Sequence, residues 1–225
     1  MSIQVADKET ENAKASPDRG IRYTVREPKI TAGRLFFVVK RAFDILAAAL
    51  GFAVLAIPLL VIALLIKLDT RGTVIFRQER LGKDGKPFTM YKFRSMYMDA
   101  EKNGPQWADK IDWRCTRVGR VLRKTRLDEL PQLWNILVGD MSFVGPRPER
   151  EYFYKQFETY IDGFHYRMAV RPGLTGLAQV NGGYDLSPEE KIVYDIEYIE
   201  NMSVKMDLMC IFKTVRLVFS HDGAR

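Results

Sequence analysis

The sequence predicts an α+β protein in which a re-entrant membrane helix hairpin carries a small, helix-rich domain with a β-hairpin and interfacial amphipathic helices. Residues 45–66 form an uncharged apolar run, and a segment with a period of two follows around an Asp-Gly pair. Residues 1–33 are polar and nearly free of aromatic side chains. We therefore expect a flexible arm over 1–33, the membrane helix over 34–68 and a cytoplasmic-face domain over 69–225.

The composition allows a proper core and favours an anionic partner. The 225 residues are 47% hydrophobic and 12% aromatic, which is enough to bury one domain. Lys and Arg number 35 against 28 Asp and Glu, so the formal charge is +7 at pH 7. This charge suits nucleic acid, phosphates or an acidic membrane surface, and its sign alone does not choose among them. Cys115 and Cys210 lack the spacing of a zinc site or a disulfide framework.

The apolar run is long enough to cross a membrane, at about 1.5 Å per residue against a ~30 Å hydrocarbon core. Pro58 cannot donate to Val54, so it should kink or break the helix. Basic residues flank the run on both sides: Arg34, Lys40, Arg41, Lys67, Arg71, Arg77 and Arg80. Because Lys and Arg favour the cytoplasmic side, we expect the chain to enter and leave by that face and to turn near Pro58. The alternative is a buried central helix of a soluble protein.

The stretch "TVIFRQERLGKDGKPFTMYKFRSM" predicts two strands joined at Asp84-Gly85, a favoured turn pair. Four basic side chains should point outward from this hairpin: Arg77, Arg80, Lys92 and Arg94. Further basic residues recur at three-residue spacing, along one helical face: Arg114, Arg117, Arg120 and Arg123. This face has two interpretations, a clamp for a diphosphate or an ordinary solvated or lipid-facing surface.

The stretch "RLDELPQLWN" places two carboxylates, Asp128 and Glu129, side by side. Leucines at helical spacing predict a helix here, and Pro131 is tolerated only in its first turn. The pair should therefore lie at a helix N-terminus, where the dipole favours negative charge and free amides can receive phosphate oxygens. The alternative is that Asp128 alone, or Thr125 with Asp128, merely caps the helix.

Three later stretches carry similar alternatives. In "SFVGPRPER" two prolines hold Arg147 on a stiff turn, which suits a fixed phosphate contact or an ordinary surface turn. The glycines of "RPGLTGLAQVNGG" either admit a ligand close to the backbone or make turns. The stretch "SVKMDLMCIFKTVRLVF" predicts a helix that lies on a membrane interface or packs against the core.

Taken in order, these segments resemble the bacterial sugar transferases, the monotopic polyprenol-phosphate phosphoglycosyl transferases. The resemblance covers about Val39 to Phe219, and "LDELPQLWN" together with "GPRP" is its most specific part. One residue departs from the pattern, since Ile57 stands where members often carry Ser before the hairpin proline. Larger members also carry an N-terminal four-helix bundle, so we expect the minimal catalytic form here.

The resemblance implies transfer of a phosphosugar from a nucleotide diphosphate-sugar, of the UDP-sugar type, to polyprenol phosphate such as undecaprenyl phosphate. It implies that Asp128 is the nucleophile, which forms a covalent phosphosugar intermediate, and that Glu129 holds Mg²⁺ with Asp128 or manages protons. The residues implied in substrate and phosphate binding are Arg123, Arg147, Arg94 and Gln132. The chemistry is consistent, because a carboxylate can approach a diphosphate only when its charge is cancelled by a metal ion and arginines.

The expected location is the bacterial inner membrane, with the catalytic domain on its cytoplasmic face and in contact with membrane lipids. No nucleic acid partner is expected, and a homo-oligomer stays open. Two other functions remain. One is a membrane-bound glycosyltransferase that moves only the sugar and leaves both phosphates on the nucleotide. The other is a non-enzymatic, lipid-binding scaffold of an export complex.

Overall fold

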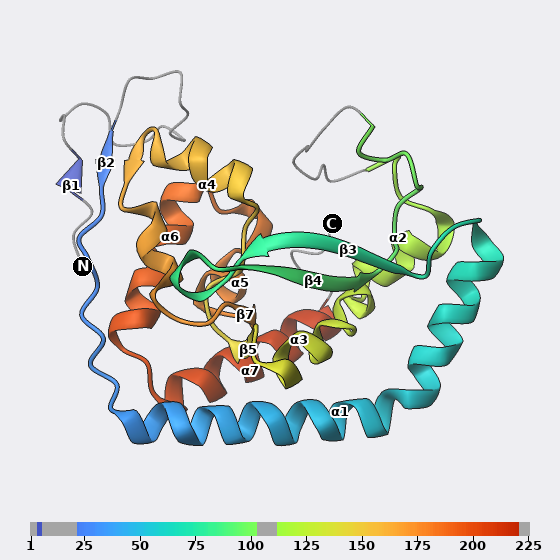
Figure 1. Cartoon of the computed structure of the whole chain (residues 1–225), viewed down its shortest axis with the longest axis horizontal. Coiled ribbons are helices and arrows are strands. Elements are labelled where there is room, and N and C mark those ends of the chain that lie inside the picture. Colours follow the sequence, from blue (N-terminus) through green and yellow to red (C-terminus); the bar gives the residue numbers. More distant parts are fainter. Residues whose placement is uncertain (1–3, 6–21, 103–111, 221–225) are drawn as a thin grey trace.

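The computed structural model describes residues 4–5, 22–102 and 112–220. Figure 1 shows a long helix, α1 (Arg34–Asp69), running beneath a domain of short helices crossed by a β-hairpin. The helices of this domain are α2 (Arg117–Lys124), α3 (Gln132–Val138), α4 (Glu151–Glu158), α5 (Leu177–Asn181), α6 (Pro188–Glu200) and α7 (Val204–Ser220). The hairpin is β3 (Ile75–Leu81) with β4 (Pro87–Phe93), and the short strands are β1 (Gln4–Val5), β2 (Tyr23–Thr24), β5 (Ser142–Val144), β6 (Ile161–Asp162) and β7 (Gly173–Thr175). Single 3-10 turns are η2 (Lys83–Gly85), η3 (Leu127–Glu129), η4 (Phe164–Ala169) and η5 (Gly183–Asp185). The predicted mixture of helix and strand is confirmed.

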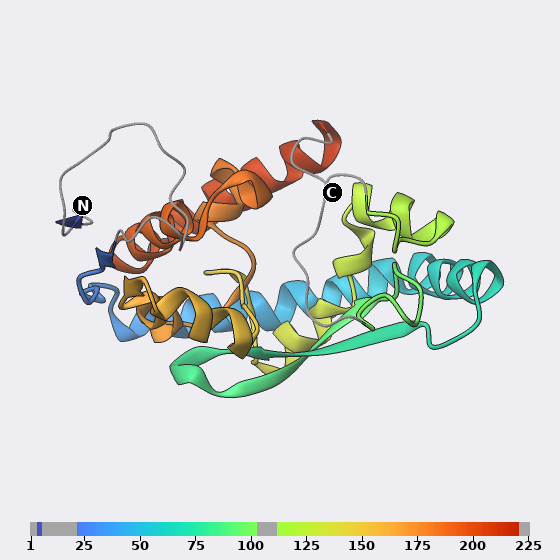
Figure 2. The same ribbon diagram turned by 90° about the horizontal axis from the view of Figure 1, so that it is seen from above.

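Helix α1 is continuous over 36 residues and contains Pro58. Among the described residues it is the one helix long and apolar enough to cross a membrane, and only 11% of its most apolar window is buried. That exposure contradicts the alternative of a buried central helix. Figure 1 shows a bend near one end, for which Pro58 supplies a cause because it lacks an amide donor. In Figures 1 and 2 no two arms of α1 lie side by side, so the helix is bent rather than folded into a closed hairpin.

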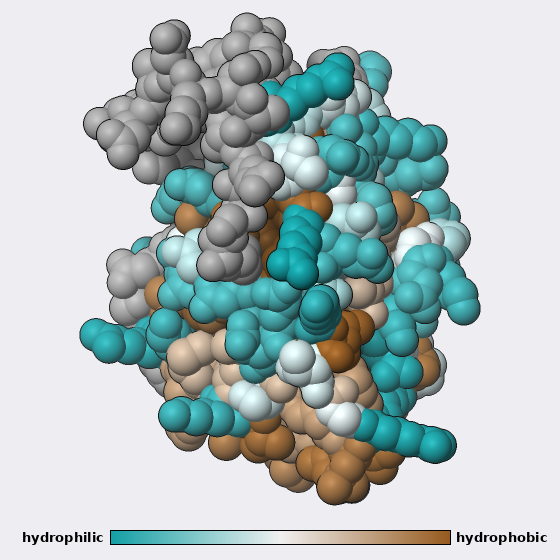
Figure 3. All heavy atoms as spheres, turned by 90° about the vertical axis from the view of Figure 1, so that its left-hand side faces the viewer, coloured by the Kyte–Doolittle hydropathy of each residue, from teal (hydrophilic) through white to brown (hydrophobic). Residues whose placement is uncertain are grey.

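The large exposed hydrophobic side chains concentrate on α1 and α7. Figure 3 shows hydrophobic residues gathered at the bottom of the molecule, where α1 lies, beneath a mostly hydrophilic body. On α7 the exposed members are Val204, Leu208, Phe212 and Val215, whereas Cys210 is fully buried. The sequence left open whether this helix packs against the core or presents an apolar face to a membrane interface. Helix α7 packs on the core on one side and has an exposed apolar face on the other.

Polar contacts attach α1 to the domain. Arg41 donates to the carbonyls of Ile136 and Leu137, at 2.6 and 2.8 Å, near the end of α3. The buried carboxylate of Asp44 accepts from Ser142 Oγ and Phe143 N. These contacts supply hydrogen-bond partners to the charged side chains of Arg41 and Asp44, as the burial of polar groups requires. They also fix the domain directly above α1.

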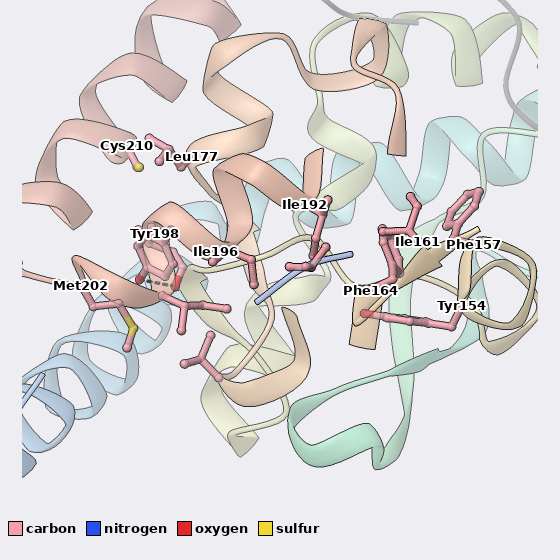
Figure 4. Packing of buried hydrophobic residues seen from close by; sticks show 14 of the residues in the cluster. Tyr154, Phe157, Ile161, Phe164, Leu177, Ile192, Ile196, Tyr198, Met202 and Cys210 are labelled. Atoms are coloured by element: carbon pink, nitrogen blue, oxygen red, sulfur yellow. Dashed lines mark hydrogen bonds between the residues drawn. The ribbon is translucent and has the colours of Figure 1, made fainter. Parts of the chain in front are cut away.

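The largest core cluster joins α4, η4, α5, α6 and α7 (Figure 4). Tyr154, Phe157 and Phe164 pack edge to face, and the Tyr198 hydroxyl reaches Asp207 at 2.7 Å. Smaller clusters lie between α1 and α3 and between α1, β4 and α2. The largest cluster also contains Val144 of β5 and so anchors the strand that precedes the Pro146–Pro148 turn.

The β-hairpin prediction is confirmed. Strands β3 and β4 pair in antiparallel register from Ile75 opposite Phe93 to Leu81 opposite Pro87. At the turn, Asp84 and Gly85 both adopt positive φ angles, 56° and 71°, as a tight hairpin turn requires.

The predicted arm needs a correction over the part that the structure describes. Strand β2 pairs in parallel with β6, and the neighbouring Val25 belongs to the core. Thr31 also donates to the Glu200 carbonyl at 2.8 Å. Residues 22–33 therefore pack on the domain, because β2 pairs with β6 and the side chains of Tyr23 and Val25 join the core. Residues 1–3 and 6–21 lie outside the described residues.

The glycine-rich loop serves close backbone packing. Strand β7 pairs in parallel with β5, and a Cβ on Gly173 would lie 2.1 Å from the Gly145 nitrogen. Only glycine allows this approach. The Pro146–Pro148 turn follows β5, so the pairing of β5 with β7 sets the position of this turn.

Candidate active site

A cleft of about 810 Å³ opens between the β-hairpin, α2, η3 and the turn after β5. Among the described residues that line it, ten are basic: Arg77, Arg80, Lys92, Arg94, Arg123, Arg126, Arg147, Arg150, Arg167 and Lys191. Four are acidic: Glu101, Asp128, Glu129 and Glu149. A cavity lined by such an excess of cations focuses a positive field and suits a polyanionic ligand.

The two adjacent carboxylates lie in this cleft, on the 3-10 turn η3. Arg126 before them adopts a left-handed conformation with φ 58°, and Leu130 and Pro131 continue helically into α3. Neither η3 nor α3 has a side-chain cap, and Thr125 Oγ1 bonds back to Val121 of α2. The capping alternative is therefore wrong, and the helix proper begins later than the sequence predicts.

Glu129 is 9% exposed and is surrounded by cations. Arg147 donates to both of its oxygens, with 3.3 Å from Nη1 to Oε2, and Lys92 Nζ lies 3.2 Å from Oε1. Burial raises the pKa of Glu129, but Arg147 and Lys92 outweigh it and hold the pKa well below its ordinary value. Glu129 therefore stays ionised and is held in one position.

Asp128 has the opposite surroundings. It is 8% exposed and accepts no hydrogen bond from any described residue. Burial first, and the neighbouring charge of Glu129 second, raise its pKa to about 6, against the pull of Lys92, Arg123 and Arg147. At neutral pH its carboxylate is mainly ionised, with oxygens free to react or to bind a cation.

A buried ion pair supports the turn that carries Arg147. Arg167 of η4 pairs with Asp195 of α6 at 2.6 Å, and Arg167 Nη2 donates to the Arg147 carbonyl at 3.0 Å. The guanidinium also lies 4.9 Å from the Phe164 ring centroid. The backbone at Arg147 is thus fixed by residues far along the chain.

Three of the predicted site arginines, Arg94, Arg123 and Arg147, line the cleft, but they have different roles there. Arg147 contacts Glu129, and Arg123 lines the cleft from α2. Arg94 is buried, and its guanidinium donates to the carbonyls of Arg71 and Thr70 at 2.5 and 2.8 Å. We correct its predicted role, since these bonds satisfy carbonyls just after the end of α1 at Asp69 and leave both terminal nitrogens of its guanidinium engaged there.

Two further predictions need correction. Gln132 is buried on α3 and does not line the cleft, because the first turn of that helix faces the core. Arg114 lies before α2, which begins at Arg117, and it pairs with Asp112 at 2.6 Å. The basic face therefore ends short of Arg114, and only Arg123 of that series reaches the cleft.

Comparison with known proteins identifies the family of this chain. The family profile described as "Bacterial sugar transferase" matches residues 35–221. The chain belongs to this family. It is 45% identical over 194 residues to the UDP-N-acetylgalactosamine-undecaprenyl-phosphate N-acetylgalactosaminephosphotransferase of Aeromonas hydrophila, covering 85% of this chain and 46% of that protein. It is 46% identical over 187 residues to the exopolysaccharide production protein PSS of Rhizobium leguminosarum, covering 79% and 94%.

A further relative of this bacterial sugar transferase is a UDP-glucose:undecaprenyl-phosphate glucose-1-phosphate transferase of Klebsiella pneumoniae, 45% identical over 192 residues, covering 83% of this chain and 41% of that protein. The chain thus spans less than half the length of the Aeromonas and Klebsiella relatives. The part that it shares with them contains the cleft and the carboxylate pair.

The site of this sugar transferase fits a magnesium ion held by few protein ligands. No group of three or more His, Cys, Asp or Glu residues among those described could hold a metal. Mg²⁺ is commonly bound by one or two carboxylates together with waters and substrate phosphates. Asp128 offers unbonded oxygens, whereas those of Glu129 already face Lys92 and Arg147. Asp128 would therefore be the principal ligand.

Sequence reasoning missed several residues of the site. The sequence predicts only that Lys92 points outward from the hairpin, yet it contacts Glu129. Arg167 and Asp195 belong to no recognisable motif. Glu149 pairs with Arg80 at 3.0 Å and follows Pro148 directly in the sequence. That position next to the Pro-Arg-Pro turn is the sequence feature that could have indicated it as a site residue.

Proposed function

We propose that this protein is a phosphoglycosyl transferase that moves a sugar 1-phosphate from a UDP-sugar to undecaprenyl phosphate, the first step in building a polysaccharide or glycoconjugate repeat. One observation carries the proposal: a buried carboxylate with unbonded oxygens, Asp128, faces a cleft lined by ten basic residues. The names of the relatives supply the classes of donor and acceptor.

In the first half-reaction, an Asp128 oxygen attacks the β-phosphorus of the bound nucleotide diphosphate-sugar. A bond forms between that oxygen and phosphorus, and the bond from phosphorus to the bridging oxygen breaks, so that nucleoside monophosphate leaves. Arg123 and Arg147 lie where they can neutralise the diphosphate, which otherwise repels the carboxylate. A bound Mg²⁺ would supply further neutralisation of the same charge.

In the second half-reaction, a phosphate oxygen of the polyprenol phosphate attacks the same phosphorus. The acyl-phosphate bond to Asp128 breaks, and the carboxylate is regenerated. Glu129 stays ionised between Arg147 and Lys92 and holds these cations beside the reacting phosphorus.

The proposed location is the inner membrane, with the domain on the cytoplasmic face. Support comes from the apolar exposed surface of α1 and from basic residues at both of its ends, Arg34 and Lys67 among them. A helix bent at Pro58 could enter and leave by one face, with the outer face of α7 lying in the interface. The cleft would then open near the lipid headgroups.

The test uses purified enzyme, Mg²⁺ and a panel of UDP-sugars without acceptor. Intact mass spectrometry should show a phosphosugar adduct, mapped to the peptide that contains Asp128, together with release of UMP. Release of UDP with no adduct would instead establish a glycosyltransferase that moves only the sugar. Absence of any turnover with every sugar, in the presence of acceptor, would leave a binding role and overturn the proposal.

A further inference from the structure

A second, smaller cavity of about 140 Å³ lies behind η3, between β7, α5 and α7. Its walls are mainly apolar, with Leu130, Leu174, Val180, Leu217 and Val218. Three further residues line both this cavity and the cleft: Arg126, Glu129 and Gln179. Glu129 therefore stands between a polar cavity on one side and an apolar one on the other.

The junction of the two cavities carries groups suited to an anion. Arg126 holds a left-handed conformation, which is strained for a residue with a side chain and is typical of functional sites. Both polar atoms of the Gln179 amide are buried without a hydrogen-bond partner among the described residues. Because an unsatisfied buried amide is costly, a ligand that bonds to it here would gain affinity.

The size of the apolar cavity suits one branched hydrocarbon unit. An engineered apolar cavity of about 150 Å³ takes up benzene, and a five-carbon isoprene unit is similar in size. Its outer wall is α7, where Leu217 and Val218 line the cavity while Phe212 and Val215 are exposed. The wall is thus one helix away from the apolar surface that the protein presents.

We propose that this cavity binds the first isoprene unit of the polyprenol phosphate acceptor, with the acceptor phosphate beside Arg126 and Gln179. The inference rests on the proposed function and adds to it an acceptor site distinct from the donor cleft. The phosphate oxygen would approach the phosphosugar on Asp128 from the α7 side, while the remaining isoprene units leave the cavity toward the lipid. Charge complementarity at Arg126 and continuity with the apolar surface favour this occupant.

The test compares two valines of α7. Val218→Trp fills the cavity, and Val215→Trp places the same bulk on the exposed face of the same helix. With undecaprenyl phosphate in detergent micelles, Val218→Trp should raise the acceptor KM at least tenfold. Adduct formation and UMP release without acceptor should match those of Val215→Trp, which shows that the variant is folded. Equal acceptor KM values for the two variants would overturn the inference.

A second measurement needs only the wild-type protein, in case Val218→Trp does not fold. A prenyl phosphate with a diazirine on its first isoprene unit is photolysed in its presence, with undecaprenyl phosphate as competitor. Competed label should map to 174–180 or 214–218, and competed label confined to other segments would refute the site. If the wild-type protein forms no adduct and releases no UMP, the proposed function itself fails, which is a different result from either of these.

Discussion

Arg167 and Asp195 form an ion pair of 2.6 Å in which both side chains are 1% exposed, and Arg167 also donates to the carbonyl of Arg147. The pair joins η4 to α6 beneath the turn that carries Arg147. Arg147 in turn contacts Glu129. The position of the carboxylate pair thus depends on two residues that do not touch it.

Asp195→Asn should destabilise the protein by about 3 kcal/mol, because it leaves the charge of Arg167 buried without its partner. Urea unfolding measures the change. The matched control is Lys155→Ala, which breaks an exposed pair with Glu151 and should cost less than about 1 kcal/mol. If both variants unfold at the same urea concentration, the buried pair does not support the turn.

Arg147→Lys should lower kcat/KM for UMP release by about tenfold or more. Lysine keeps the charge but loses the fork that contacts both oxygens of Glu129. The control is Arg120→Lys, since Arg120 is exposed on α2 and does not line the cleft. Wild-type kinetics for Arg147→Lys would remove this arginine from the site.

Features with a local cause could be predicted from the sequence. The apolar helix follows from an uninterrupted run, and the hairpin follows from alternation around Asp84-Gly85. The prolines on either side of Arg147 likewise predict that this residue lies on a stiff turn. Each of these signals lies within a few residues of the structure that it predicts.

Features that depend on packing between distant segments could not be predicted. Arg94 and Arg147 look equally basic in the sequence, yet Arg94 donates to the carbonyls of Thr70 and Arg71 just after α1, and Arg147 contacts Glu129. Gln132 stands close to the carboxylate pair in sequence but turns into the core. Which way each side chain points is set by how α1, α3 and β4 meet, which no single stretch of sequence encodes.

Cysteine labelling tests the topology of α1. In a background with Cys115 and Cys210 replaced, Leu35→Cys and Leu68→Cys place exposed thiols at the two ends of the helix, where Leu35 is 75% and Leu68 74% exposed. A membrane-impermeant reagent should label neither position in intact cells and both in inverted membrane vesicles. A control cysteine in a known periplasmic loop of another protein confirms that the reagent has access. Labelling of one end from outside would show a simple crossing.

The rate of adduct formation should fall as the pH drops through about 6. Only the ionised carboxylate of Asp128 can attack phosphorus, and burial together with Glu129 raises its pKa to about 6. Single-turnover UMP release, measured at intervals between about pH 5 and 8, brackets this pKa and gives the rate on both sides of it. A rate independent of pH down to ~4.5 would mean that Asp128 keeps an ordinary carboxyl pKa, close to that of an exposed aspartate.

Asp128→Asn should abolish adduct formation and yet make the protein more stable at neutral pH. The folded-state pKa of Asp128 is raised above its unfolded value, so the native state binds more protons between about pH 4 and 6, and this residue lowers stability as the pH rises through that window. An uncharged amide avoids both the burial of a charge and its repulsion by Glu129, so the gain should reach about 1–3 kcal/mol above pH 7 and vanish near pH 3. Urea unfolding at pH 7.5 and pH 3, with Asp162→Asn at an exposed site as the control, measures the difference. A catalytic carboxylate that is kept at a cost in stability explains both effects together. An Asn variant that forms the adduct at the wild-type rate would remove Asp128 as the nucleophile, and one that is less stable than wild type at pH 7.5 would show that its charge supports the fold instead.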